Sequence, residues 1–174
     1  MLDDKKALGL DTARAELNLE MANSYMKMKK YNDAIALLKS KITSGKAGVN
    51  DYYSIGRAYY YSKDFVNADS SFSKIVVAQP ELSLGYLWRA KANVQMDPEN
   101  KQWKSKELYE TFISKIKPEE IERSKKDLID AYNYLAAYHA SKKDCAGTKA
   151  CLLKVVELDP NNAQAKKVLA SLKC

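Results

Sequence analysis

Two stretches of the chain, residues 52–80 and 132–160, carry one pattern of small, aliphatic and ring side chains, and each ends on a proline. The matching positions are Gly56 with Ala136, Ile55 with Leu135, Tyr59 with His139, Phe72 with Leu152 and Ile75 with Val155. A third copy lies 34 residues before the first. A fixed period of this length is typical of stacked helical hairpins, each of which buries its apolar face against its neighbours. The sequence therefore predicts an all-α solenoid of antiparallel helix-turn-helix repeats.

Within each copy the apolar positions follow a three- and four-residue spacing, which places them on one face of a helix. Gly56 and Ala68 are small where the two helices of a hairpin would cross, so the backbones can approach closely. Tyr59, Phe65 and Phe72 are large and are predicted to fill the remaining space.

The composition is that of a soluble globular protein, with 46% hydrophobic and 29% charged residues. No apolar run approaches the length of a membrane-spanning helix, so we expect no membrane insertion. The first residues lack the continuous apolar core of a signal peptide.

The net charge is +7, which is compatible with an acidic partner or with nucleic acid. However, the lysines are interspersed with acidic residues, and there is no run of five basic residues. Mixed-sign charge of this kind favours a solvated helical exterior and argues against nucleic-acid binding.

The pattern resembles that of the tetratricopeptide repeat family, whose 34-residue unit has two antiparallel helices, A and B. The stretch that starts at Val49 matches the family consensus at Tyr52, Ile55, Gly56, Tyr59, Phe65, Ala68, Phe72, Ile75 and Pro80. The resemblance implies a right-handed α-solenoid. It divides the chain into the remnant of a preceding repeat at 1–14, four repeats at 15–48, 49–82, 83–117 and 118–162, and a capping helix at 163–174. Because residues 6–16 align with the end of one repeat and the start of the next, we expect the chain to be a piece of a longer array.

The third and fourth repeats depart from the consensus. The turn at 97–103 is about three residues longer, and helix B of the third repeat is predicted from Trp103 to Ile116. Pro118 suits a first helical position, so one long helix is expected from Pro118 to about Ser141. A last amphipathic helix is expected from Ala163 to Leu172.

No catalytic motif is present: the sequence has no glycine-rich phosphate loop and no nucleophile elbow. The single histidine, His139, occupies a slot that tyrosine fills in other repeats, which favours a ring packed between helices over a general base. Asp97, Glu99 and Asn100 form a polar cluster that is predicted to be a turn rather than a cation site. We expect no enzyme activity, no cofactor and no metal.

The three cysteines are Cys145, Cys151 and Cys174. A helical hairpin with its turn near Asn161 would bring Cys174 back toward Cys145, so a disulfide between them is predicted if the protein lives outside the cytoplasm. The alternative is free thiols, with Cys151 a small packing residue.

The resemblance implies that ligands lie in a concave groove lined by the A helices. The side chains that it places there are Asn23, Lys27, Tyr53, Arg57, Tyr60, Tyr61, Lys91 and Asn133. Tyrosines around an arginine have the composition of a binding hot spot. The alternative is that Tyr60 and Tyr61 only pack on neighbouring helices. Of the clamp with which some family members hold chaperone carboxyl termini, only Asn23 is present, which argues against that docking mode.

The predicted function is therefore that of a protein–protein interaction scaffold, which binds a peptide or a helical segment. Single-stranded nucleic-acid binding and a role as an accessory repeat segment of a larger multidomain enzyme are the alternatives. The lengthened turn, the extended helix and the Tyr- and Lys-rich repeats also resemble bacterial repeat proteins exported to the cell envelope. That resemblance favours the periplasm or cell envelope over the cytoplasm.

Overall fold

The computed structural model describes residues 17–43, 45 and 47–173, and all regular secondary structure in this part of the chain is helical. Residues 17–27 form the first described helix. The later elements are α2 (Tyr31–Thr43), α3 (Val49–Tyr61), α4 (Phe65–Ala78), α5 (Ser83–Met96), α6 (Lys106–Ser114), η1 (Pro118–Glu120), α7 (Ile121–Ser141), α8 (Cys145–Leu158) and α9 (Ala163–Ser171). None of these helices is long and apolar enough to cross a membrane. The predicted repeat remnant at 1–14 lies outside the described residues.

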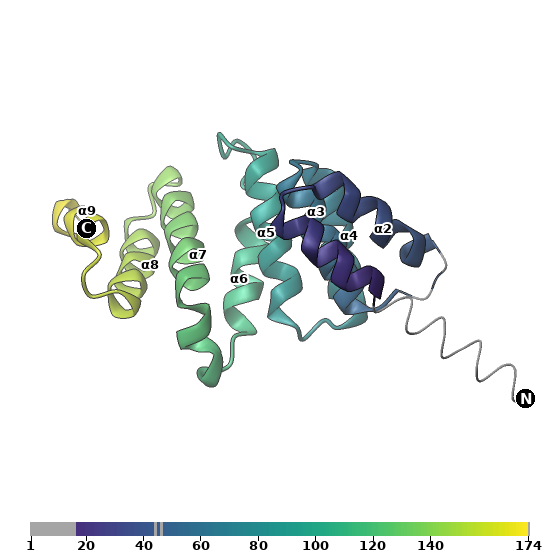
Figure 1. Cartoon of the computed structure of the whole chain (residues 1–174). Helices are drawn as coiled ribbons and strands as arrows, with labels where there is room; N and C mark the ends of the chain where they lie inside the picture. The colour runs from purple at the N-terminus through teal and green to yellow at the C-terminus, as the bar shows by residue number, and fades with distance from the viewer. Residues whose placement is uncertain (1–16, 44, 46, 174) are drawn as a thin grey trace, which may run out of the picture. The chain divides into compact units, whose positions relative to one another are not determined.

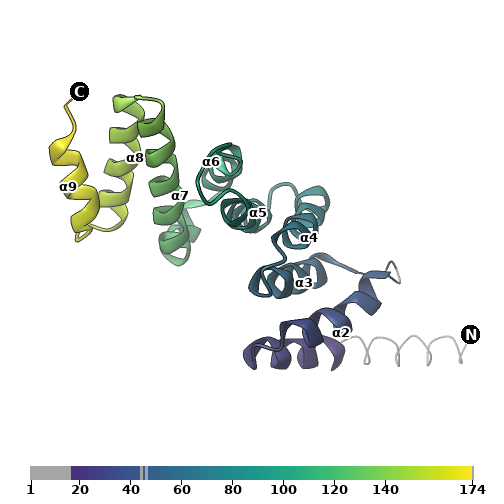
Figure 2. The same ribbon diagram turned by 90° about the horizontal axis from the view of Figure 1, so that it is seen from above.

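The chain divides into two compact units, an N-terminal unit of residues 1–80 and a C-terminal unit of residues 81–174. Within each unit, every helix packs on the next one in sequence. In the N-terminal unit α2 packs on α3 and α3 on α4, and in the C-terminal unit the same order runs from α5 to α9 (Figures 1 and 2). Packing between sequence neighbours is what a repeat architecture requires. The repeat boundaries themselves stay a prediction.

The contact between α3 and α4 is centred on Phe72, which is fully buried together with Ala68 and Ile75. Gly56 of α3 faces the ring of Phe72, and a Cβ atom at Gly56 would lie only 2.6 Å from Phe72 Cε1. This close approach agrees with the small residue that was predicted at the crossing. The rest of the core of the N-terminal unit contains Ala22, Ala34, Ile35, Leu38, Ile55 and Ala58.

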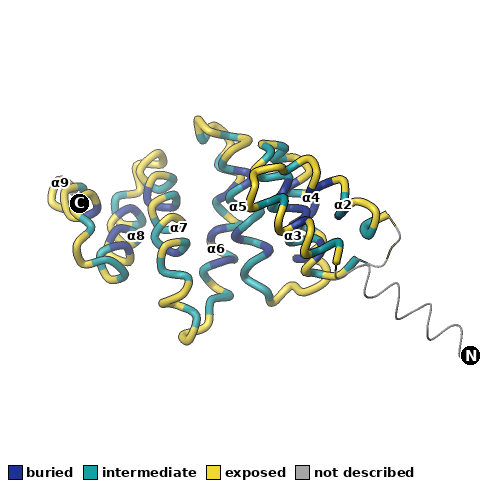
Figure 3. Tube along the Cα trace, viewed as in Figure 1, coloured by how far each residue is buried: buried dark blue, intermediate teal, exposed yellow. Residues whose placement is uncertain are grey.

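The C-terminal unit has two adjoining apolar clusters. The first contains Leu87, Ala90, Tyr109, Phe112, Leu128, Ala131 and Leu135. The second contains Ala136, Leu152, Val155 and Ala165, with Val168, Leu169 and Leu172 packed against it. Buried positions alternate with exposed ones along each helix, as the three- and four-residue spacing predicted (Figure 3).

Asp97 holds together the lengthened turn between α5 and α6. Its carboxylate accepts hydrogen bonds from the backbone amides of Lys101, Gln102 and Trp103 at 2.9, 2.8 and 3.1 Å. These bonds, above all the one from Gln102, lower the pKa of Asp97. The segment around Asp97 is therefore a turn, as predicted.

Two predicted helix bounds were wrong. Helix α6 begins at Lys106 and not at Trp103, because Trp103 has a left-handed backbone (φ 52°) and the hydroxyl of Ser105 donates to the carbonyl oxygen of Ala90 at 2.8 Å. The predicted helix from Pro118 begins instead as a short 3-10 turn, η1, before α7. The other predicted bounds agree with the structure to within about two residues.

Three hairpin turns share one backbone form. Lys29, Lys63 and Lys143 each have a positive φ, between 58° and 67°, between the two helices of a hairpin. In each turn the next amide donates back to a carbonyl of the preceding helix, for example Asp64 N to Tyr59 O at 2.9 Å. This is the usual way in which a helix ends on a left-handed residue. Here the residue is lysine, so each turn keeps an ammonium group.

Asp144 begins α8 as its N-cap. Its carboxylate accepts the amide of Gly147 at 2.9 Å and lies 2.7 Å from Nδ1 of His139 on α7. The Gly147 amide first, and then the His139 bond, lower the pKa of the Asp144 carboxyl below its ordinary value of 3.8. A carboxyl whose pKa is lowered by folding stabilises the fold above its unfolded pKa, and this stabilisation is lost as the pH falls through the folded pKa.

We therefore expect Asp144→Ala to lower the free energy of unfolding at pH 7. The difference in this free energy between the variant and the unsubstituted chain should become smaller below about pH 4. The matched control is Asn162→Ala. Asn162 caps α9 through an uncharged side chain that accepts the Ala165 amide at 3.0 Å. Its loss should cost about 0.5–2 kcal/mol at every pH. Urea denaturation of both variants between pH 3 and 7 tests this, and parallel pH profiles would contradict the role of the Asp144 charge.

Candidate functional site

The N-terminal unit contains an open groove of about 430 Å³ between the helix at 17–27 and α3. Helix α3 and the helix at 17–27 supply most of its wall, and the turn before α2 and the start of α2 add Lys29 and Tyr31. We call it the N-terminal groove, and it is lined by Asn23, Met26, Lys27, Lys29, Tyr31, Ser54, Arg57 and Tyr61.

Aromatic rings hold the arginine of the groove in place. The guanidinium carbon of Arg57 lies 5.4 Å from the ring centre of Tyr53 and 5.9 Å from that of Tyr61. Tyr61 in turn stacks on Tyr31, with ring centres 5.8 Å apart and planes at 23°. Cation–π contacts of this kind orient a guanidinium. The groove therefore has a cation in a defined position beside stacked tyrosines, and the side chain of Tyr61 is still 43% exposed.

Four of the predicted groove residues line this groove, namely Asn23, Lys27, Arg57 and Tyr61. Tyr53 lies behind them, with its ring 6.5 Å from that of the buried Phe72. Tyr60 packs edge-on against Tyr61 and Phe65, each at 5.5 Å. Tyr60, and in part Tyr61, therefore pack on neighbouring aromatic rings. This packing is the alternative that the sequence left open.

Met26, Lys29, Tyr31 and Ser54 also line the groove, and of these four only Met26 occupies an A-helix position that the family resemblance assigns to a groove. Lys29 and Tyr31 belong to the turn and to the start of α2, whereas the prediction used positions of the A helices only. The sequence did contain a signal for Lys29 and Tyr31. A lysine and an aromatic residue flank this hairpin turn, and Lys63 and Phe65 repeat the pair at a later turn. A turn that bends back over the end of helix A brings such residues to the groove.

Lys91 and Asn133, the two other predicted residues, belong to the C-terminal unit. The Nζ atom of Lys91 lies 2.6 Å from Oδ1 of Asp127 and 5.2 Å from the ring centre of Trp88. This ion pair joins α5 to α7 and engages the lysine inside the unit. Asn133 is exposed on α7.

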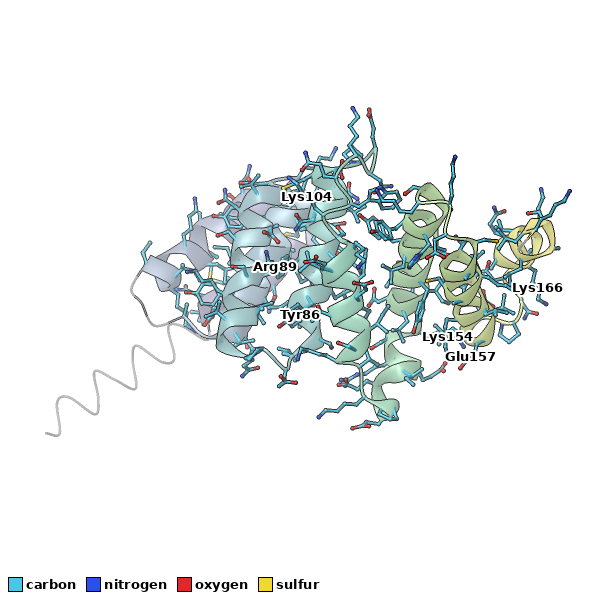
Figure 4. All side chains as sticks on the ribbon, turned by 180° about the vertical axis from the view of Figure 1, so that it is seen from behind. Tyr86, Arg89, Lys104, Lys154, Glu157 and Lys166 are labelled. Carbon is cyan, nitrogen blue, oxygen red and sulfur yellow. The ribbon has the colours of Figure 1, made fainter. Side chains whose placement is uncertain are left out.

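The other faces of the C-terminal unit carry ordinary surface charge. Lys154 and Glu157 form an ion pair one turn apart on α8 at 2.7 Å, and Lys104 and Lys166 are exposed (Figure 4). Tyr86 and Arg89 lie on α5, where Arg89 replaces the usual aliphatic residue and is partly exposed. No cluster of three potential metal-ligating His, Cys, Asp or Glu side chains occurs among the described residues.

His139 links α7 to the start of α8 through a polar contact in addition to ring packing. Its ring contacts Tyr138 at 5.4 Å and the Asp144 carboxylate that caps α8. A Cβ atom at Gly147 would collide with the imidazole, so the glycine makes room for the bridge. These contacts give His139 a structural role in the α7–α8 hairpin.

The described cysteines differ in state. Cys151 has a free thiol, it packs against both apolar clusters of its unit, and burial raises its pKa. Cys145 is disulfide-bonded. Because Cys174 lies outside the described residues, the predicted pairing of Cys145 with Cys174 stays a prediction.

Among solved structures, the chain is similar to the C-terminal part of a TPR repeat-containing protein from Cytophaga hutchinsonii, with 33% sequence identity and a TM-score of 0.84. The match covers 95% of this chain and 64% of that one, so the chain spans less than two thirds of the length of its relative. A weaker likeness, with 15% identity and a TM-score of 0.49, covers 91% of this chain and 98% of a thermophilic TPR protein from Thermus thermophilus. No family model and no curated protein matches the chain.

The structural likeness to the Cytophaga protein confirms the predicted fold class, an all-α solenoid of helical hairpins. Repeats of this type commonly serve as scaffolds for protein interaction rather than as catalysts, and their concave surfaces bind other proteins. Taken with the consensus residues of the Val49 repeat and the hairpins that they form, this likeness shows that the chain has the helical-hairpin repeat fold of the TPR repeat-containing protein from Cytophaga hutchinsonii.

Proposed function

We propose that the protein is a non-catalytic interaction scaffold that binds a peptide segment of another protein in the N-terminal groove. The observation that carries the proposal is the convergence of Asn23, Lys27, Arg57 and Tyr61 on one groove from two separate helices. Side chains that donate hydrogen bonds stand there beside exposed ring surface, which is the composition of an interface hot spot.

The groove is also preorganised, which reduces the entropy that a partner must overcome on binding. The order of contacts runs outward from the core: buried Phe72 contacts Tyr53, Tyr53 contacts Arg57, and Arg57 contacts Tyr61. Since Phe72 is fully buried, the innermost member of this series is fixed by packing.

Peptide display against the intact chain tests the proposal. Peptides selected for binding should lose at least about tenfold in affinity for Arg57→Ala and for Tyr61→Ala, because truncation of a hot-spot side chain costs about 2 kcal/mol or more. The control is Val77→Ala on α4, whose side chain is 80% exposed and outside the groove. The peptide affinity of this control should change less than about twofold.

Circular dichroism of the three variants should be unchanged, which separates a loss of binding from a loss of fold. If every selected peptide binds Arg57→Ala and Tyr61→Ala as tightly as it binds the unsubstituted chain, the groove is not the binding site.

A further inference from the structure

A second hollow adjoins the N-terminal groove and extends it past the hairpin turns. It measures about 550 Å³ and shares Lys29, Tyr31 and Tyr61 with the groove. Its other lining residues come from the turns before α2 and α4 and from the first turn of α2, namely Lys30, Asn32, Asp33, Ser62 and Lys63. The two hollows therefore form one continuous track within the N-terminal unit, with Tyr61 and Tyr31 at its middle.

The charge along this track is strongly one-sided. Of the residues that the structure describes, none that lines the N-terminal groove is acidic, and Asp33 is the acidic one that lines the adjoining hollow. Five cationic side chains among these described residues line the two hollows, namely Lys27, Lys29, Lys30, Arg57 and Lys63. This local excess contrasts with the mixed-sign charge elsewhere on the chain, for example the ion pairs Lys154–Glu157 and Lys106–Glu110. A concentration of one sign of charge in a hollow selects partners of the opposite sign.

The spread of the cations indicates how many anionic groups a partner must supply. The lysines come from both sides of the tyrosine pair, so a single carboxylate could reach only some of them. A run of glutamate or aspartate side chains would meet them in succession. Tyr31 and Tyr61 would then contact an apolar residue within the run, and their hydroxyl groups could donate to its carboxylates.

The rings of the track favour a peptide over a nucleic acid. Binding of single strands uses open aromatic faces on which bases stack. In this track the Tyr61 ring already meets Tyr31, Tyr60 and Arg57, at 5.8, 5.5 and 5.9 Å. Its exposed part is therefore more suitable for side-chain contact than for insertion of a base.

We infer that the partner segment is an internal acidic peptide, with several carboxylates around one bulky apolar residue, bound along the track from Arg57 to Lys63. This inference rests on the proposed function, because it assigns the chemistry of the segment that the N-terminal groove binds. The hairpin turns with left-handed lysines take part in it, since Lys29 and Lys63 reach the track from those turns.

The test uses the intact chain and two fluorescein-labelled peptides with blocked ends. One peptide has glutamates on both sides of a phenylalanine, and in the other each glutamate is replaced by glutamine. In fluorescence anisotropy we expect the glutamate peptide to bind at least about tenfold more tightly at about 50 mM salt, and this advantage to shrink at about 200 mM as screening increases.

Two charge-matched double variants locate the binding. Lys27→Glu with Lys30→Glu changes one residue from each hollow, and neither residue has a positive φ. It should weaken binding of the glutamate peptide by about tenfold or more. Lys74→Glu with Lys149→Glu makes the same change of net charge at exposed positions on α4 and α8 and should weaken binding less than about threefold.

The outcomes separate this inference from the proposed function. Equal binding of the two peptides, or equal loss in the two double variants, would overturn the acidic peptide while leaving the groove in place. A blocked-end peptide that binds only after its carboxyl terminus is freed would overturn the internal run in favour of a terminal carboxylate. A thymidine oligonucleotide that binds more tightly than the glutamate peptide and depends on Lys27 and Lys30 would overturn it in favour of nucleic acid. Failure of the groove itself would appear separately, in the Arg57→Ala and Tyr61→Ala measurements.

Discussion

Phe72→Ala should lower the free energy of unfolding by about 3–5 kcal/mol. Phe72 has no exposed surface, so its truncation removes a complete apolar side chain and leaves a cavity between α3 and α4. The loss should appear in urea denaturation followed by circular dichroism. Hydrogen exchange should quicken in the amides of α3 and α4 before those of α7 and α8, because a repeat protein loses stability first next to the altered contact.

The matched control for this variant is Val77→Ala on the same helix. Val77 is 80% exposed, so its truncation should change the free energy of unfolding by less than about 0.5 kcal/mol. A loss below about 1 kcal/mol for Phe72→Ala would mean that the α3–α4 contact is not centred on this ring. Weakened peptide binding is also expected in Phe72→Ala, since Tyr53 and Arg57 are supported through it.

Gly56→Val should destabilise the protein by about 1–3 kcal/mol, although valine is a better helix former than glycine. The first added carbon would already lie 2.6 Å from Cε1 and 2.8 Å from Cζ of Phe72, so the ring or the helix must move. The destabilisation arises from the clash with Phe72, so it should be smaller when a smaller residue replaces Phe72. In a Phe72→Leu background, Gly56→Val should therefore cost markedly less than it does alone.

A double-mutant cycle of Gly56→Val and Phe72→Leu, measured by urea denaturation, gives this coupling directly. Ala36→Val on α2 serves as the control, because Ala36 is exposed and valine there changes only the helix propensity, by about 0.5 kcal/mol. Additive costs in the cycle would show that the close approach of Gly56 to Phe72 does not limit the packing of α3 on α4.

The sequence was sufficient to predict the interior of the hairpins. Gly56, Ala68, Phe72 and Ile75 are specified by helical spacing alone, because a residue that faces the neighbouring helix recurs every three or four positions. The assignment of Arg57 and Tyr61 to a groove came from the resemblance to the tetratricopeptide repeat family, and helical spacing is consistent with it because it puts both residues on one face of the helix. Such positions depend on one helix and its immediate neighbour, which the repeat pattern already gives.

Contacts that depend on the conformation of a turn could not be predicted from the repeat pattern. Helix α6 begins three residues late because the Asp97 carboxylate takes up three amides and Trp103 adopts a left-handed backbone, and neither follows from apolar spacing. Lys29 reaches the groove through a turn conformation of the same kind. The Lys91–Asp127 pair spans the lengthened turn, so its register could not be derived from a 34-residue period.

The turn organised by Asp97 has a consequence for how chains of this kind can diverge. Extra residues were accommodated at the tip of one hairpin, while Ala90 and Phe112 on either side of it remain buried in the same apolar cluster. In a β-sheet, a one-residue shift would reverse the face of every later side chain. The effect of an insertion at a hairpin tip stays local, so the tip after Met96 is a natural place to graft a foreign loop without altering the residues that line the N-terminal groove.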